Sequence, residues 1–227
     1  MTSICKHGGS IRPFKIYLYT YEKMKTDSFV QYCRMLLFTL MFVSFSGICT
    51  APSIGYRNKM DNFKRLYNYV QRKHFESEFS RFIKDLGFSE SGNNWQSINR
   101  IGCFGEWQFA EKTLHHLGHK NITARKFRAD PSIFPPELQL KVLKSLIKMN
   151  MVYLKDYERF VGDTIRGVVI TKSGMIAACH LGGPTSLKLF LNSKGRINRQ
   201  DAFGTSMADY LRKFSYYDLD SFNGYTL

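Results

Sequence analysis

Apolar residues recur at helical spacing in two long stretches of the chain. The first covers residues 61–86, where Asp61 is a suitable N-cap and Gly87 a suitable stop. The second follows two adjacent prolines and covers about residues 136–157. The spacing predicts two long helices. The apolar members of the first are Phe63, Leu66, Tyr67, Val70, Phe75, Phe79, Phe82, Ile83 and Leu86.

Three shorter helices are predicted towards the C-terminus, at residues 175–181, 185–191 and 207–214. A Gly-Gly-Pro sequence separates the first two, and Ser206 begins the third with Asp209 in capping-box register. Between the two long helices, turn residues and glycines alternate with apolar residues, which predicts short strands or an irregular hairpin. The fold class is therefore mainly α (α+β), with a small β-hairpin excursion. The apolar residues of that middle piece are Ile98, Ile101, Phe104, Trp107 and Phe109.

The N-terminal part of the chain follows a different pattern. No charged residue lies between Arg34 and Arg57, and residues 35–49 form one apolar run. This run is shorter than the roughly 20 residues of a bilayer-spanning helix, but it has the length, basic flank and small residues of a secretory signal. We therefore predict a leader over residues 1–55, followed by a folded domain over residues 56–220.

Two interpretations of the leader are possible. The apolar run begins late for a signal peptide, and translation from Met24 instead of Met1 would give an ordinary n-region. The alternative is a retained membrane anchor that extends to about Ala51. Both place the domain outside the cytoplasm, in the periplasm or cell envelope of a bacterium.

The charge of the chain predicts a polyanionic partner. Lys and Arg number 33 against 18 Asp and Glu, a net charge of +15. Six basic and two acidic residues give +4 in residues 1–50, which leaves +11 for the remainder. The basic residues are scattered without a known nucleic-acid motif, so no nucleic-acid partner is expected. An acidic wall polymer is the better match.

Five cysteines are present, and a removed leader would leave Cys103 and Cys179 with the domain. In an exported protein these two could pair or remain free buried thiols. The histidines at 115, 116 and 119 lack companions at ligand-like intervals, so no metal site and no cofactor are expected.

Glu90 is the candidate for acid–base chemistry. It follows the first predicted helix in a neighbourhood of Phe88, Trp95, Phe104 and Trp107. A carboxyl group beside apolar rings loses hydration of its charged form and can hold a proton near neutrality. A general acid for a glycosidic oxygen needs this property, and aromatic rings provide surfaces on which sugars stack. A solvated carboxylate at a helix end is the competing interpretation.

Three ordered motifs resemble the lysozyme-like lytic transglycosylases. They are a Glu-Ser pair at 90–91, a Gly-Glu-Trp-Gln-Phe segment at 105–109, and an Ala-Ala-Cys-His-Leu-Gly-Gly segment at 177–183. The tail segment 201–210 is similar to one found in lysozyme-like domains of wall-active proteins. In the third motif, Cys179-His180 replaces the family's Tyr-Asn. The resemblance covers about residues 61–215 and implies a lysozyme-like domain.

The resemblance implies that Glu90 is the single acid/base that cleaves peptidoglycan between N-acetylmuramic acid and N-acetylglucosamine. It also implies substrate contacts by Ser91, Gln108, Trp107 and His180, and partners in the form of glycan strands and wall-remodelling or secretion machinery. From the residues alone, Ser91 can instead cap its turn, and Trp107 and His180 can belong to the core.

Two other functions remain compatible with the sequence. A hydrolytic muramidase of the same fold would need a carboxylate that activates water, and Asp201 and Glu106 are the candidates. A catalytically inactive peptidoglycan-binding protein would keep the fold without the reaction.

Overall fold

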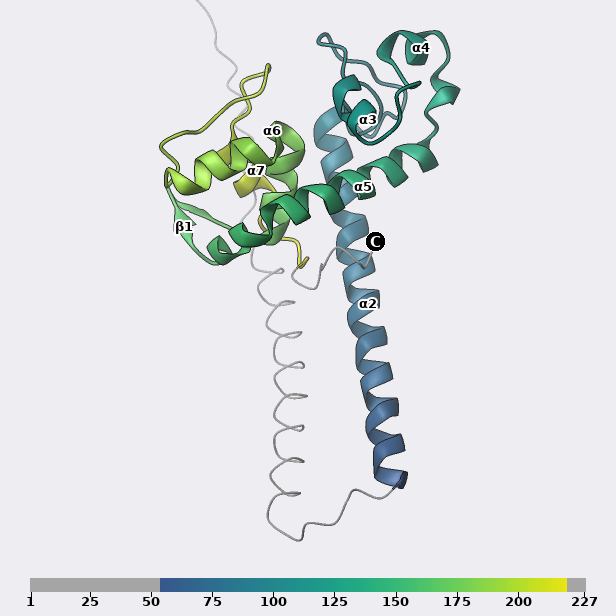
Figure 1. Ribbon diagram of the computed structural model, residues 1–227, viewed down its shortest axis with the longest axis vertical. Coiled ribbons are helices and arrows are strands. Elements are labelled where there is room, and N and C mark those ends of the chain that lie inside the picture. The colour runs from purple at the N-terminus through teal and green to yellow at the C-terminus, as the bar shows by residue number, and fades with distance from the viewer. Residues whose placement is uncertain (1–53, 220–227) are drawn as a thin grey trace, which may run out of the picture. The chain divides into compact units, whose positions relative to one another are not determined.

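The computed structural model describes residues 54–219, with side chains from Lys59 onward (Figure 1). The apolar run at 35–49, which predicts the signal or anchor, lies outside the described residues. None of the described helices is both long and apolar enough to cross a membrane. The chain divides into two compact units, Met1–Met60 and Asp61–Leu227, and the candidate site belongs to the second.

The described part of the chain is mainly helical, as predicted, and contains one two-stranded antiparallel hairpin. In the hairpin, Thr164 pairs with Val169 and Ile165 with Val168. The elements are α2 (Ile54–Ser91), α3 (Glu111–His116), α4 (Ala124–Ala129), η1 (Pro131–Ile133), α5 (Pro136–Leu154), η2 (Lys155–Phe160), β1 (Thr164–Ile165), β2 (Val168–Val169), α6 (Lys172–Asn192) and α7 (Met207–Lys213).

The hairpin does not lie where the sequence pattern placed the β excursion. Residues 95–110 form turns with two isolated bridges, Ile98 to Phe104 and Phe104 to Phe109. The backbone takes positive φ angles at Gly102, Gly105 and Gln108, and each of these interrupts the extended conformation that a strand requires. The segment is therefore a compact loop, which we call the 95–110 loop.

The first long helix ends later than predicted. Gly87 remains helical, and the 95–110 loop packs directly on it: a Cβ atom at this position would lie 2.8 Å from Glu106 Oε1. The helix stops at Ser91, since Gly92 and Asn93 take left-handed φ angles of 68° and 61°. The glycine at 87 thus serves close packing, and Glu90 and Ser91 lie in the last helical turn.

The core lies where the C-terminal half of α2 meets α5, α6, α7 and the 95–110 loop. Helix α6 packs against both α5 and α7, and α5 runs between the α6–α7 pair and the α3–α4 segment (Figure 1). Aromatic rings join the loop to α4 and to the residue after η1, with Phe104 4.9 Å from Phe127 and 6.0 Å from Phe134 between ring centroids. Buried members on α2 and in the loop are Phe75, Phe79, Phe82, Leu86, Phe104, Trp107 and Phe109.

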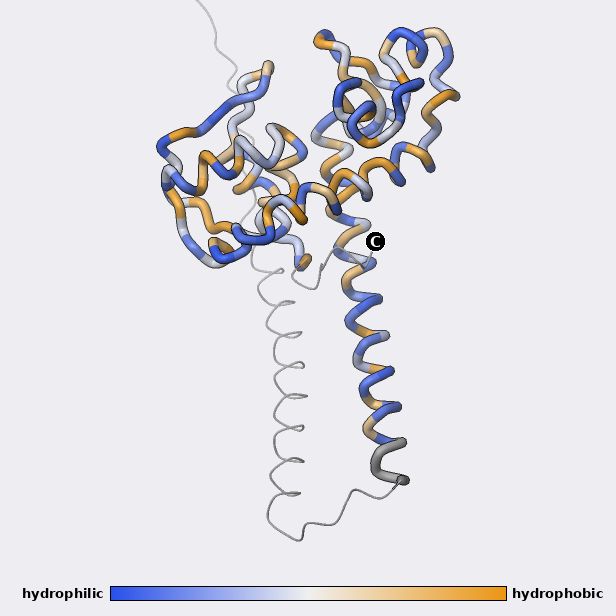
Figure 2. Tube along the Cα trace, viewed as in Figure 1, coloured by the Kyte–Doolittle hydropathy of each residue, from blue (hydrophilic) through white to orange (hydrophobic). Residues whose placement is uncertain are grey.

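The N-terminal half of α2 takes no part in this core. Within the described residues, burial on α2 begins at Phe75. Figure 2 shows apolar positions scattered among hydrophilic ones along the preceding turns. The apolar pattern therefore predicts the helix correctly but does not mark buried positions there. The exposed apolar side chains are Phe63, Leu66, Tyr67, Tyr69 and Val70.

The C-terminal helices break and begin at the positions that the sequence predicts. Gly183 has φ 76° and ψ 164°, so α6 is broken where the Gly-Gly-Pro sequence predicts a break. Helix α7 begins with the predicted capping box, in which Ser206 Oγ accepts from the Asp209 N–H at 3.3 Å and the Ser206 N–H donates to Asp209 Oδ2 at 3.0 Å. The short helices α3 and α4 were not predicted.

Replacing Ser206 by Ala is expected to reduce the free energy of unfolding by about 1 kcal/mol, because the cap of α7 is lost. Urea unfolding measures it. The hydrogen bonds from Ser206 lower the pKa of Asp209, so their stabilisation is present above the ordinary carboxyl pKa of about 4 and disappears as acid protonates the folded state. The difference in the free energy of unfolding between the wild type and Ser206→Ala should therefore shrink below that pH. Ser145→Ala, on the exposed face of α5, is the control, and an equal cost there would contradict the capping role.

Candidate functional site

Glu90 lies half-buried at the end of α2 and is bonded to α7. The Tyr210 hydroxyl donates to Glu90 Oε1 at 2.6 Å, and the same hydroxyl lies 3.3 Å from Ser89 Oγ. Lys213 Nζ donates to Ser89 Oγ at 2.6 Å. Burial, followed by the charge of Glu90, raises the pKa of Tyr210 above its ordinary value. The hydroxyl therefore keeps its proton at neutral pH and holds one carboxyl oxygen of Glu90 in place.

Ser91 joins the end of α2 to the 95–110 loop. Its hydroxyl donates to the Glu106 carbonyl at 2.7 Å and accepts from the Asn94 N–H at 3.0 Å. Of the two roles considered for Ser91, the structure shows the turn-capping one. The bond also ties the Glu-Ser pair to the Gly-Glu-Trp-Gln-Phe segment.

Trp107 belongs to the core. Its side chain is only 4% exposed, and its indole N–H donates to the Ile83 carbonyl at 2.9 Å. A ring covered in this way offers no flat surface to a sugar, so we remove Trp107 from the expected substrate contacts. It fixes the 95–110 loop against α2 instead.

His180 and Gln108 also act on the loop, and neither hydrogen-bonds to Glu90. His180 Nε2 lies 2.8 Å from the Trp107 carbonyl oxygen. A carbonyl cannot donate, so Nε2 carries a proton. Gln108 Nε2 donates to the Gly105 carbonyl at 2.7 Å. Within the described residues, His180 Nδ1 and Gln108 Oε1 are buried without a hydrogen-bond partner. The third motif thus contacts the second through His180.

Gln139 is a positioning residue that the sequence pattern did not reveal. Its side chain, on α5, is fully buried. Its Oε1 accepts from the Glu106 N–H at 2.7 Å, while its Nε2 donates to the Phe134 carbonyl at 2.7 Å and the Trp95 carbonyl at 2.9 Å. One amide therefore holds both ends of the 95–110 loop. A polar residue on an otherwise apolar helix face is the signal that would have identified it.

The two other candidate carboxylates have different environments. Burial raises the pKa of Glu106, and its carboxyl lies against the backbone of Gly87. Asp201 Oδ1 accepts from the Phe203 and Thr205 N–H groups at 2.9 and 2.8 Å, so it holds the turn before α7. The charge of Asp201 also contributes to the raised pKa of Tyr210.

Both cysteines of the domain are free thiols, Cys103 half-buried and Cys179 buried. Burial, with a smaller contribution from the charge of Glu90, raises the pKa of Cys103. Of the two alternatives, the structure shows unpaired thiols. Among the described residues, no group of three or more His, Cys, Asp or Glu side chains is arranged to hold a metal ion.

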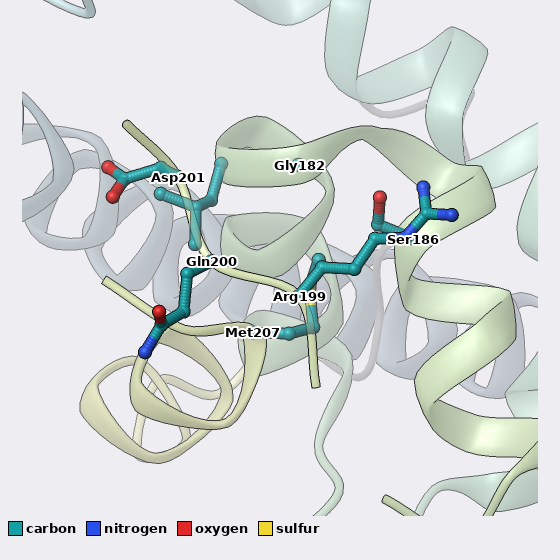
Figure 3. A pocket seen from close by; sticks show the side chains of 7 residues that line it. Gly182, Ser186, Arg199, Gln200, Asp201 and Met207 are labelled. Carbon is teal, nitrogen blue, oxygen red and sulfur yellow. The ribbon is translucent and has the colours of Figure 1, made fainter. Parts of the chain in front are cut away.

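Two loops meet beside this site. Arg100 donates to the Ala202 carbonyl at 3.4 Å, and its guanidinium lies 4.7 Å from the Phe203 ring centroid. The 95–110 loop is thereby joined to the segment that precedes α7. A pocket of about 240 Å³ lies next to that segment (Figure 3). It is lined by Leu181, Gly182, Ser186, Arg199, Gln200, Asp201 and Met207.

The arrangement defines one half-buried carboxyl group, held by a tyrosine donor, where three separate segments of the chain meet. No protein-family profile, curated protein or solved structure matches the chain significantly.

Proposed function

We propose that this chain is a peptidoglycan lytic transglycosylase of lysozyme-like fold, with Glu90 as its single acid/base. The hydrogen bond from Tyr210 to Glu90 is the observation that carries the proposal. It joins the Glu-Ser pair to the tail segment, while Ser91 and His180, from the first and third motifs, both bond to the Gly-Glu-Trp-Gln-Phe segment of the 95–110 loop. Segments that resemble family motifs therefore also contact one another around one carboxyl group.

The geometry suits a reaction with one carboxyl group. Tyr210 donates to Oε1 of Glu90, and the proposed reaction uses Oε2 for the proton transfers. Glu90 donates this proton to the glycosidic oxygen as the bond from muramic acid C1 breaks. The resulting carboxylate then accepts the proton of the muramic C6 hydroxyl, whose oxygen bonds to C1 and closes an anhydro ring. Water is not consumed, and Glu90 ends protonated as it began.

The charge of the chain supports a wall substrate. The +11 outside residues 1–50 would attract a strand whose stem peptides carry carboxylates. As part of the proposal, the chain is exported to the periplasm or cell envelope and acts with wall-remodelling or secretion machinery.

The test is product analysis after digestion of purified peptidoglycan by the full-length chain. Anhydro-muropeptides are one water lighter than hydrolysis products and resist borohydride reduction. Their release by the wild type and absence with Glu90→Gln would support the proposal. Reducible ends would indicate a hydrolytic muramidase, for which Asp201 and Glu106 are the candidate bases. Binding without cleavage would identify an inactive wall-binding protein.

Tyr210→Phe is expected to lower kcat about tenfold while KM on soluble glycan strands stays nearly constant. The variant leaves the ring in place but removes the hydrogen bond that stabilises the carboxylate formed as Glu90 gives up its proton, a bond worth roughly 1.5–3 kcal/mol. Steady-state kinetics gives both constants.

Tyr217→Phe is the matched control, because the Tyr217 hydroxyl donates at 2.6 Å to another carboxylate, that of Asp85. It should lower stability without lowering kcat. An equal loss of kcat in both variants would mean that Tyr210 acts only through the fold.

A further inference from the structure

The pocket beside α7 is formed by three parts of the chain. Leu181 and Gly182 lie just before the break in α6, and Ser186 just after it. Met207 begins α7, and residues 199–201 close the remaining side. The break at Gly183 therefore shapes one wall of the pocket. Figure 3 shows the Arg199 side chain extending towards Ser186, whereas Gln200 and Asp201 extend the other way.

The loop that carries Arg199 is held firmly in place. The Met207 N–H donates to the Arg199 carbonyl at 3.0 Å, and the Asp201 N–H donates to the Thr205 carbonyl at 2.9 Å. Gln200 and Ser206 form a β-bridge. The Ala208 N–H donates to Asn198 Oδ1 at 3.0 Å. Backbone bonds on both sides of Arg199 thus fix where its side chain begins, as a preorganised binding residue requires.

The pocket adjoins Glu90 through α7. Met207 lines the pocket, and Tyr210, which binds Glu90, lies three residues later on the same helix. At 1.5 Å per residue the two are separated by about 5 Å along the axis. Asp201, another lining residue, affects the pKa of Tyr210 electrostatically. The pocket and the Glu90 site are therefore linked through one short helix.

Arg199 supplies a charge that no described residue neutralises. Its side chain is exposed and makes no hydrogen bond or ion pair within the described part of the chain. Asp201 lines the same pocket, but one of its carboxylate oxygens already accepts two backbone N–H groups. An unpaired guanidinium suits a carboxylate, which it can bind with two parallel hydrogen bonds.

We infer that Arg199 binds a carboxylate of the peptide stem on the muramic acid next to the cleaved bond. The inference rests on the proposed function and adds specificity to it. In a strand that carries stems, the lactyl carboxyl group of muramic acid is consumed in the amide to the stem, so the stem carboxylates are the anionic groups that Arg199 can bind. The pocket thereby makes the chain prefer strands with free stem carboxylates over strands whose stem carboxylates are neutralised.

The experiment compares two substrates: glycan strands with their stems, and the same strands after the stem carboxylates have been converted to neutral amides. The full-length wild type is expected to cleave the first with a kcat/KM about tenfold higher, the scale of one charge-assisted hydrogen bond. Arg199→Gln should bring the ratio of the two kcat/KM values close to one. Arg196→Gln, an exposed arginine of the same loop whose Nε donates to the Ser193 carbonyl, should keep the wild-type ratio.

If the ratio of the two kcat/KM values is unchanged in Arg199→Gln, the inference is overturned while the proposed function stands. If the wild type cleaves neither substrate, the proposed function fails, and binding decides the inference separately. Calorimetry with a soluble N-acetylglucosaminyl-N-acetylmuramyl peptide, and with the same compound whose peptide carboxylates are amidated, gives this readout on the full chain. Tighter binding of the form with free carboxylates, lost in Arg199→Gln, supports the inference; equal binding of both forms overturns it.

Discussion

Glu90→Gln is expected to lower kcat for glycan cleavage by about 10²–10⁴-fold, the usual contribution of a positioned acid–base group. The amide keeps the size of the carboxyl group, and its oxygen can still accept from the Tyr210 hydroxyl. It cannot give a proton to the glycosidic oxygen or take one from the C6 hydroxyl. Binding of strands and the free energy of unfolding should therefore change little. Release of soluble muropeptides measures the rate.

Glu137→Gln is the matched control, because Glu137 is an exposed glutamate in the first turn of α5. It should retain the wild-type rate. Glu106→Gln tests the hydrolytic alternative, since burial raises the pKa of Glu106 but its carboxyl is packed against Gly87. A Glu90→Gln protein that cleaves as fast as the wild type would remove Glu90 from its proposed role. A loss confined to Glu106→Gln would transfer the role to Glu106.

The helices could be predicted where local signals set their limits. Proline pairs, Gly-Gly-Pro and the Ser206 capping box act within a few residues, and the structure contains α5, the broken α6 and α7 at those positions. The end of α2 could not be predicted in the same way. Glycine is a residue type that often ends helices. Here Gly87 stays within the helix and is packed against the 95–110 loop, which lies later in the sequence.

The contacts of the candidate site were less predictable than its central residue. Glu90 stands out by its motif, whereas its partner Tyr210 lies 120 residues away and no periodicity relates the two. Trp107 was expected at the substrate because aromatic residues serve both cores and sugar sites. Its burial and its hydrogen bond to the Ile83 carbonyl show that the side chain belongs to the core. Residue type thus suggests which side chains could carry chemistry, and tertiary contacts show which of them are covered.

Gln139→Leu is expected to lower the free energy of unfolding by about 3 kcal/mol or more, because it leaves three backbone groups without partners at about 1–3 kcal/mol each. These are the Phe134 carbonyl, which is buried, and the Glu106 N–H and Trp95 carbonyl, which are partly buried. Leucine has a similar size, so the loss would report hydrogen bonding and not a cavity. Urea unfolding measures it, and hydrogen exchange should be faster at the Glu106 amide. Gln96→Leu, at an exposed position of the same loop, is the control and should cost little.

Gly105 allows the role of Gln139 to be separated from general packing. A Cβ at Gly105 would lie 2.6 Å from Gln139 Oε1, and the φ of +84° disfavours any other residue. Gly105→Ala should therefore destabilise through a clash and through backbone strain of about 1–2 kcal/mol. In a Gln139→Ala background only the strain remains, so Gly105→Ala should cost less there than in the wild type. Strictly additive costs would show that the Gln139 side chain does not hold the loop through this contact, because coupled neighbours are not additive. A coupling confined to this pair would identify Gln139 as the residue that positions the loop to which Ser91, beside Glu90, is bonded.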